Sequence, residues 1–316
     1  SWPSRRDRGS TIEYPHDVTM KILFTGIGGS GVWTMRAEQV AATRAEWKAI
    51  PDASRRDAEG MDAVVIVKKI KDRSLSEMKA WGGPLVYDAL DFWGQTRRLW
   101  RVGPRLRNLE DARTLAKPVL SRIDPDLVLC PTAQMASDLA PLGWPTRLYY
   151  HHYDPRLVPA RRDDGRIRKR VIYHGRVGHL GIWHVFVWLS CRAHGVDFAT
   201  CNGPQPLPSD VMFAARRASP WISRRWKSNI KAAIALRMGL PFVAWPEAGY
   251  VETHPTALWF KTPLQMHRAI GAALEMEPGA PDDSFSVEKC AKSLEATIEE
   301  MLRSRMDLEP QELRSR

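Results

Sequence analysis

The stretch Arg225–Glu252, RWKSNIKAAIALRMGLPFVAWPEAGYVE, carries the plainest fold signal in this sequence. It predicts a helix from about Asn229 to Met238, because Gly239–Pro241 is a typical helix stop. A continuous apolar run at Phe242–Trp245 predicts a buried strand directly after it. Continuous apolar strands that alternate with helices are typical of a parallel sheet covered on both faces.

The same alternation extends outward from this stretch. In the second half of the chain we expect strands at Arg170–Tyr173, Val196–Cys201, Val211–Ala214 and Leu258–Phe260, and helices at Leu180–Ala193, Pro263–Met276 and Ser286–Arg303. In the first half we expect strands at Met20–Thr25, Ala63–Val67, Leu85–Tyr87 and Leu127–Leu129, and a helix at Val32–Ala49. The polar residues 41–60 predict no strand, and the prolines and charges of residues 149–170 predict a linker.

Strands that alternate with helices, twice over, predict an α/β protein of two Rossmann-like domains that face each other across a cleft. We expect an N-terminal arm over residues 1–19, a first domain over 20–155 and a second domain over 156–285. A C-terminal helix over residues 286–316 is expected to pack back on the first domain.

The strand that ends in Gly175-Arg176, followed about 50 residues later by the stretch quoted above, resembles the GT-B glycosyltransferases. The C-terminal domains of that family carry a strand-Gly-Arg turn, a helix that ends Ala-x-x-x-Gly-x-Pro, a buried strand, and a loop with Gly and Glu. Here these are Gly175-Arg176, Ala235 to Pro241, Phe242–Trp245 and Glu247–Glu252. The resemblance covers most of Met20–Met276 and implies a two-domain sugar transferase.

The resemblance implies a nucleotide diphosphate sugar as donor, with UDP as the expected nucleotide. Transfer of the sugar leaves a pyrophosphate, and its developing charge must be neutralised. Arg176 and Lys227 are suited to this, and the first turn of the helix that begins at Asn229 favours phosphate. The predicted donor-binding residues are Gly28, Gly29, His174, Arg176, Lys227, Asn229, Lys231, Glu247, Gly249, Tyr250 and Glu252.

One feature of the family is missing from this sequence. Retaining members usually place a Glu eight residues before a second Glu in this stretch, but the positions near Lys227 and Ile234 are not acidic. The usual sugar and ribose contacts are therefore not implied, and the stereochemical outcome stays open. The alternative to donor binding is that Lys227 and Lys231 belong to an ordinary solvent-exposed helix start.

The glycine loop Gly26–Gly31 matches the pattern G-x-G-x-x-G between a strand and a helix. A nicotinamide-binding unit also needs a second strand that ends in an acidic residue about 20 positions later. Because we expect no strand in residues 41–60, a dehydrogenase is the less favoured interpretation. A glycine loop that lines the cleft between the domains is favoured over it, and a turn without a ligand is the alternative.

Asp88 and Asp91 follow a buried strand, at the position where open α/β sheets bind ligands. If the reaction inverts, a carboxylate must take the proton of the acceptor hydroxyl, and either aspartate could be this base. Their spacing of three positions would place them on one helical face. Helix capping is the alternative for each.

The sequence gives little sign of a metal site or of redox chemistry. The four cysteines are widely spaced with no CxxC, so we expect reduced thiols. His151, His152 and Asp154 are a weak metal signal or an acceptor contact. We therefore predict no obligatory metal.

The charge of the chain favours a polyanionic partner. Lys and Arg number 47 against 36 Asp and Glu, a net charge of +11, and the basic residues gather at Arg97–Arg107, Arg161–Arg170 and Arg216–Lys227. Several bacteriophage enzymes of the resembling fold glycosylate hydroxymethylated pyrimidines, so duplex DNA is the favoured acceptor, with 13 Trp to stack on a flipped base. A cell-envelope saccharide or lipid at an anionic membrane is the alternative acceptor, and a non-catalytic nucleic-acid-binding module of the same fold is the alternative to an enzyme.

The sequence contains neither an apolar stretch of spanning length nor a secretory signal. We therefore expect a cytoplasmic location, which would be the host cytoplasm for a phage protein.

Overall fold

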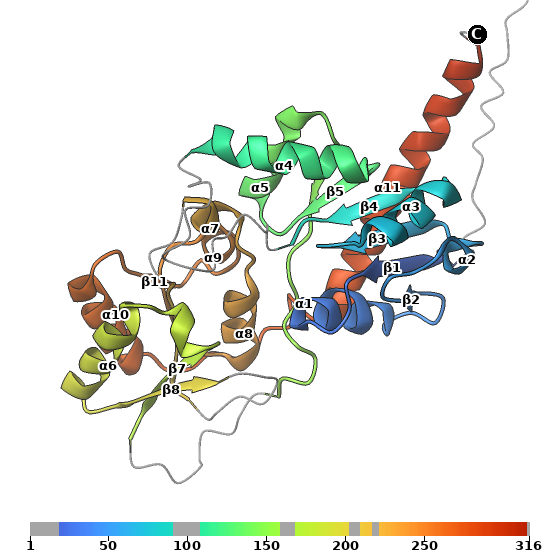
Figure 1. The fold of residues 1–316 in the computed structure, drawn as a ribbon. Helices are drawn as coiled ribbons and strands as arrows, with labels where there is room; N and C mark the ends of the chain where they lie inside the picture. Colours follow the sequence, from blue (N-terminus) through green and yellow to red (C-terminus); the bar gives the residue numbers. More distant parts are fainter. Residues whose placement is uncertain (1–18, 91–107, 159–167, 202–208, 217–220, 315–316) are drawn as a thin grey trace, which may run out of the picture.

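A computed structural model describes residues 19–90, 108–158, 168–201, 209–216 and 221–314. Figure 1 shows two lobes, the N-terminal one in blue to green and the C-terminal one in yellow to orange. Each lobe is built on a parallel sheet, so the predicted α/β class with two Rossmann-like domains is confirmed.

The N-terminal sheet has six strands in the order β2-β1-β3-β4-β5-β6. Their bounds are β1 Ile22–Gly26, β2 Lys48–Ala49, β3 Ala63–Val67, β4 Leu85–Asp88, β5 Leu127–Cys130 and β6 Thr146–Leu148. The helices of this lobe are α1 Gly31–Trp33, the π-helix η1 Thr34–Gln39, α2 Arg55–Ala58, α3 Asp72–Trp81, α4 Leu109–Ile123, α5 Ala133–Leu139 and the 3-10 turn η2 Ala140–Leu142.

The C-terminal sheet has five strands in the order β11-β10-β9-β7-β8. Their bounds are β7 Arg170–His174, β8 Asp197–Cys201, β9 Val211–Ala214, β10 Phe242–Ala244 and β11 Leu258–Trp259. The helices are the 3-10 turn η3 Val177–His179, α6 Trp183–Ala193, α7 Trp221–Trp226, α8 Ile230–Met238, α9 Ala248–Thr253 and α10 Pro263–Glu275.

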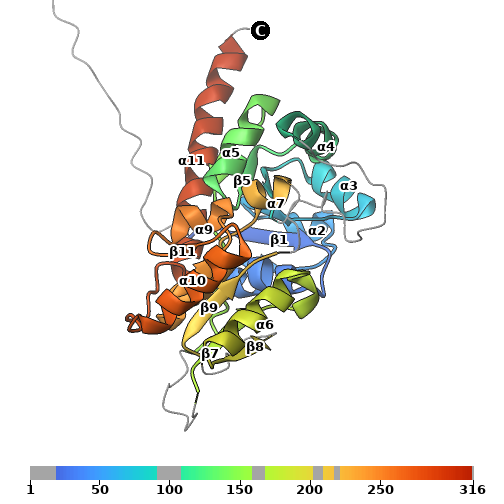
Figure 2. The ribbon, with the colours of Figure 1, turned by 90° about the vertical axis from the view of Figure 1, so that its left-hand side faces the viewer.

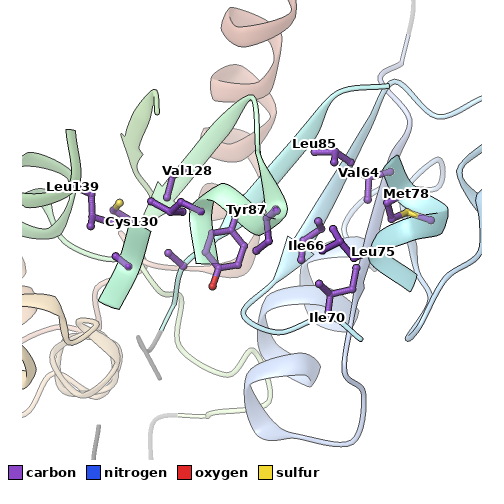
Figure 3. Packing of buried hydrophobic residues seen from close by; sticks show 14 of the residues in the cluster. Val64, Ile66, Ile70, Leu75, Met78, Leu85, Tyr87, Val128, Cys130 and Leu139 are labelled. Atoms are coloured by element: carbon purple, nitrogen blue, oxygen red, sulfur yellow. The ribbon is translucent and has the colours of Figure 1, made fainter. Parts of the chain in front are cut away.

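Apolar side chains fill both faces of each sheet, as buried parallel strands require. Figure 3 shows one core of the N-terminal lobe, where Val64, Ile66 and Val128 of the strands meet Leu75 of α3 and Leu139 of α5. In the C-terminal lobe, α6 and α10 cover one face of the sheet, and α8 and α9 cover the other.

The last helix, α11 Val287–Arg314, returns to the N-terminal lobe. Its residues Cys290, Leu294 and Ile298 join the core on the β1 face, beside Phe24 and Trp47. Figure 1 shows α11 in red along that lobe. The predicted packing of the C-terminal helix on the first domain is confirmed, because its apolar stripe is buried there.

Three expectations about local structure were wrong. Residues 41–60 do contain a strand, β2, and Asp52 follows it, with its carboxylate 2.6 Å from the ammonium of Lys71. The helical region after the glycine loop ends near Ala41 and does not continue to Ala49, because the chain turns to form β2. Asp88 ends strand β4 and is therefore not on a helical face.

Candidate functional site

The carboxyl ends of the two sheets face each other. Helix α5 begins just after β5, and α9 begins just after β10. The carboxylate of Glu252 in α9 accepts the backbone N–H groups of Ala133 at 2.8 Å and Gln134 at 3.1 Å, at the N-terminus of α5. The hydroxyl of Tyr150 donates to the same carboxylate at 3.2 Å. The loops that follow the strands of both sheets therefore lie at one interface between the lobes.

A second contact joins the lobes through Asp138 of α5. Arg225 donates Nε and Nη2 to its carboxylate at 2.9 and 2.7 Å, and the indole of Trp226 donates at 2.7 Å. Trp226 is buried in the core of the N-terminal lobe. The lowered pKa of Asp138 follows from these hydrogen bonds, which outweigh its partial burial. The α7 segment is therefore anchored on the N-terminal lobe.

Cationic side chains converge at the switch point of the C-terminal sheet, where β8 and β9 flank β7 on opposite sides. Ligands bind at this position in open α/β sheets. The pKa of His179, in η3, is lowered by partial burial and then by the charges of four cations, Lys231, Arg216, Lys227 and Arg176. Four positive side chains, three from loops and Lys231 from the first turn of α8, therefore act on His179.

Arg216, which follows β9, is fixed by Glu247. Its Nε lies 2.8 and 2.9 Å from the two carboxylate oxygens of Glu247, and its Nη2 donates to the hydroxyl of Tyr250 at 3.4 Å. Burial and the charge of Glu247 raise the pKa of Tyr250, so this hydroxyl stays neutral. Glu247 and Tyr250 thus hold a cation at the switch point.

Among the buried polar atoms without a hydrogen-bond partner in the described residues are the hydroxyl of Tyr173, at the end of β7, and the Nδ2 of Asn229, at the start of α8. The ammonium of Lys231 lies 4.8 Å from the centre of the Tyr173 ring. Burial, and secondarily the charge of Glu247, raise the pKa of Tyr173 to about 12, against the opposing charge of Arg216. Unsatisfied buried donors are costly, so these atoms indicate a polar ligand.

Two glycines in this region have no room for a side chain. Gly175 has φ +146, and an added Cβ would lie 3.0 Å from the Tyr173 ring. At Gly249 an added Cβ would lie 2.5 Å from the carbonyl oxygen of Lys227. Gly249 therefore allows α9 to pack on the backbone that leads into α8.

The glycine loop lies at the same edge of the N-terminal sheet. Gly29 has φ +72 with open space around its Cβ position, whereas an added Cβ on Gly28 would lie 2.9 Å from Pro51. Ser30 caps the first helix through Trp33 N–H. The loop is therefore shaped by the turn itself, and open space for a ligand exists at Gly29.

Asp88 lies in a buried ion pair. Arg36 of the π-helix η1 donates Nε to Asp88 Oδ2 at 2.7 Å and Nη2 to Oδ1 at 3.1 Å. The same guanidinium donates to the carbonyl of Tyr150 at 2.8 Å. Both carboxylate oxygens are therefore engaged. Asp91, the other predicted base, lies outside the described residues.

The histidines near the crossover between the lobes contact protein groups. His151 Nδ1 lies 2.8 Å from the carbonyl oxygen of His152, and its backbone N–H donates to Asn229 Oδ1 at 2.8 Å. Asp154 pairs with Arg156 at 2.7 Å. In the part of the chain that the structure describes, no group of three or more His, Cys, Asp or Glu side chains is placed to hold a metal ion. His174, at the end of β7, is half-buried.

The structure thus brings several of the predicted donor residues to the switch point. Arg176, Lys227, Lys231 and Glu247 act on the same small region. Glu252 instead binds the N-terminus of α5, and Gly28 and Gly29 lie on the other lobe. Sequence reasoning did not single out Arg216, Tyr173 or His179. Arg216 follows the apolar buried strand β9 and begins one of the basic clusters, and these were the available signals for it.

No protein-family model and no curated protein sequence match this chain. Solved structures do resemble it. One is AviGT4, a glycosyltransferase involved in avilamycin A biosynthesis, with a TM-score of 0.50 and 10% identity over 90% of this chain and 97% of that one. Another is sucrose-phosphate synthase from Thermosynechococcus elongatus, with a TM-score of 0.50 and 11% identity over 94% and 100%. At these identities the likeness shows the fold, which is GT-B.

Proposed function

We propose that this protein is a glycosyltransferase that uses a nucleotide diphosphate sugar, with UDP as the nucleotide, and transfers the sugar to a hydroxyl acceptor. The observation that carries the proposal is the geometry at the switch point of the C-terminal sheet, where Glu247 fixes Arg216 at 2.8 Å and the ammonium of Lys231 lies 4.8 Å from the centre of the Tyr173 ring. The lowered pKa of His179 agrees with this concentration of positive charge. The buried Tyr173 hydroxyl and Asn229 amide supply hydrogen-bond donors for phosphate oxygens. Both similar structures bear the names of sugar-transferring enzymes.

The chemistry follows from where charge develops. Cleavage of the bond between sugar and diphosphate places negative charge on the leaving phosphate, and fixed cations in a partly buried site stabilise that charge. Arg176 offers two-point binding, and Lys227 and Lys231 act as point charges. The first turn of α8 adds free N–H groups. Since cationic side chains supply this charge, we propose that transfer needs no metal.

The other predicted residues differ in how far their contacts allow a role in the reaction. Glu252 as a ribose acceptor stays a prediction, and its carboxylate is already engaged across the lobes. Because Arg36 occupies both oxygens of Asp88, we propose Asp91 as the carboxylate that takes the acceptor proton. We propose Gly29, at the facing edge of the N-terminal sheet, as the place where the loop approaches the donor.

Two acceptor classes remain as proposals. A hydroxymethylated pyrimidine in duplex DNA is suggested by the basic clusters, of which Arg97–Arg107 lies outside the described residues. In the cluster Arg216–Lys227, Arg216 and Arg225 are engaged by Glu247 and Asp138, so that cluster offers less charge to DNA than its sequence suggests. A cell-envelope saccharide or lipid is the second class. A gel shift with plain duplex DNA at several salt concentrations separates the two classes, because phosphate contacts are lost as salt rises.

Donor binding is tested by a thermal-shift screen of nucleotide sugars, since a ligand that binds the folded state stabilises it. Lys231→Met keeps the side-chain volume and removes the charge. We expect it to weaken UDP-sugar binding by roughly 10- to 100-fold, the range of a charge-assisted hydrogen bond. Lys292→Met, at an exposed position on α11, is the matched control. If no UDP-sugar stabilises the protein or releases UDP, or if Lys231→Met binds like the control, the proposal is wrong.

A further inference from the structure

Helix α6 presents an apolar surface to solvent. Ile182, Val185, Trp188 and Leu189 are 60%, 46%, 44% and 50% exposed. Their spacing of three, three and one residues places them on one side of the helix. We call these four residues the α6 face. The opposite side of the helix, with Val187 and Cys191, is buried in the core of the C-terminal lobe.

The α6 face lies away from the interface between the lobes. Helices α6 and α10 form one layer on the C-terminal sheet, where the rings of His194 and His267 stack at 4.3 Å. Figure 1 places this layer on the side of the C-terminal lobe that is remote from the N-terminal lobe, and Figure 2 looks directly onto it. A partner bound there leaves the facing edges of the two sheets open.

Four neighbouring apolar side chains on one exposed helix are unusual on a protein that is stable alone in water, and such patches mark interaction sites. The adjoining end of α10 adds Leu264, which is 59% exposed.

Basic side chains border this apolar surface. The guanidinium carbon of Arg192, in the last turn of α6, lies 5.0 Å from the centre of the Trp188 ring. Lys261 and Arg268 are exposed on the α10 side, and Arg168 and Lys169 are exposed at the start of β7. The exposed carboxylates that the structure describes in and next to these segments are Asp197, Glu275 and Glu277, against the five basic residues Arg168, Lys169, Arg192, Lys261 and Arg268. The border therefore carries an excess of positive charge.

We propose that the α6 face docks the protein on an anionic lipid surface. An apolar helix face with a Trp and flanking Arg or Lys is the pattern of an interfacial helix that lies in the membrane plane. Apolar side chains enter the boundary between headgroups and acyl chains, and Arg192 and Arg268 meet the phosphates. None of the described helices is long and apolar enough to cross a bilayer.

The proposed lipid contact locates the protein at a membrane surface and does not depend on the proposed sugar transfer. The apolar side chains, and not charge, decide between a lipid surface and DNA at this place. Both partners are anionic, but duplex DNA offers no apolar layer for four exposed aliphatic and aromatic side chains. The chain's net charge of +11 adds a general attraction to an anionic bilayer.

The test is sedimentation of the full chain with vesicles of phosphatidylcholine alone and of phosphatidylcholine with 30% phosphatidylglycerol, a composition of roughly one anionic lipid in three that attracts basic segments. We expect binding to the anionic vesicles, weaker binding at high salt, and little binding to the neutral ones. Quenching of Trp188 fluorescence by brominated lipid reports insertion of the helix, with Trp188→Phe to assign the signal.

Two variants locate the surface. Val185→Gln/Leu189→Gln should weaken vesicle binding by at least about tenfold, because two half-exposed aliphatic side chains no longer enter the bilayer. Arg192→Glu/Arg268→Glu should weaken it by a similar factor on anionic vesicles alone. Val158→Gln, which changes an aliphatic side chain that is 67% exposed outside this surface, is the control. Unchanged thermal melting confirms that each variant folds.

Three results would overturn the proposal. Wild-type protein that ignores anionic vesicles removes the lipid partner. Vesicle binding that is unchanged in both the Val185→Gln/Leu189→Gln and the Arg192→Glu/Arg268→Glu variants assigns the lipid contact to another basic segment. A wild-type dimer that the Val185→Gln/Leu189→Gln variant converts to a monomer shows that a second copy covers the face. Since none of these readouts needs a nucleotide sugar, failure here is distinct from failure of the proposed function.

Discussion

The ion pair of Arg36 and Asp88 supports the sharpest prediction about stability. The two side chains are 0% and 1% exposed. Burial acts to lower the pKa of Arg36, but the charge of Asp88, its hydrogen bond with Arg36 and the neighbouring Tyr149 and Cys290 together outweigh burial, so the pKa lies above its ordinary value. The Arg36 guanidinium therefore stays charged at neutral pH. The Arg36 guanidinium also stacks 3.8 Å from the centre of the Tyr149 ring and donates to the Tyr150 carbonyl, so the pair ties β4 to the crossover between the lobes.

Arg36→Met leaves the Asp88 carboxylate buried without its partner. Breaking a buried pair in this way costs about 3–5 kcal/mol of unfolding free energy. Asp88→Asn leaves the guanidinium charge uncompensated and should cost a similar amount. The double variant Arg36→Met/Asp88→Asn contains no unpaired charge, so its loss should be smaller than the sum by about 2 kcal/mol or more.

Urea unfolding at pH 7, followed by tryptophan fluorescence and far-UV circular dichroism, measures these differences. Two single variants that each lose less than about 1 kcal/mol, or a double variant whose loss equals the sum, would refute the reasoning. The double variant also tests the earlier prediction about the base. UDP-sugar turnover that persists in it removes Asp88 from the reaction, whereas loss of turnover with UDP still bound makes Asp88 the base.

Four further outcomes are expected. Both ring nitrogens of His254 are buried without a partner among the described residues, and burial lowers its pKa to about 4. Between pH 7 and pH 5 the unfolded chain therefore binds a proton that the folded protein does not, and the free energy of unfolding should fall by about 2 kcal/mol. His254→Phe should remove this part of the pH dependence in urea titrations at the two pH values, and an unchanged pH dependence would contradict the role of His254. Gly249→Ala should lower the melting temperature, since its Cβ would lie 2.5 Å from the Lys227 carbonyl oxygen; an unchanged melting temperature would show that α9 shifts freely. Glu252→Gln combined with Asp138→Asn should make the two lobes unfold in separate calorimetric transitions, because these two carboxylates join the lobes through Ala133 and Gln134 and through Arg225 and Trp226, and a single wild-type-like transition would argue against this. A chelator should leave sugar transfer unchanged, and complete loss of turnover would instead require a metal.

The fold was predictable where local sequence and burial agree. The bounds of β3 Ala63–Val67 and β9 Val211–Ala214 are those expected from the sequence, because both are short apolar runs buried on both faces. The sequence did not indicate β2 Lys48–Ala49 or β6 Thr146–Leu148. These strands lie at the two edges of the sheet and are partly exposed, so they lack the apolar run that marks a buried strand.

The sequence by itself determined the α/β alternation, the glycine turns and the basic helix start around Lys227–Lys231. Only the tertiary structure decided which charges are paired. It brings Arg216 beside Glu247, Arg36 beside Asp88, and Asp138 beside Arg225, across separations of 31, 52 and 87 residues. Parallel neighbours in a sheet are distant in sequence, and electrostatic attraction depends on distance in space. The loop residues that meet at the facing edges therefore acquire their partners only when both sheets have formed.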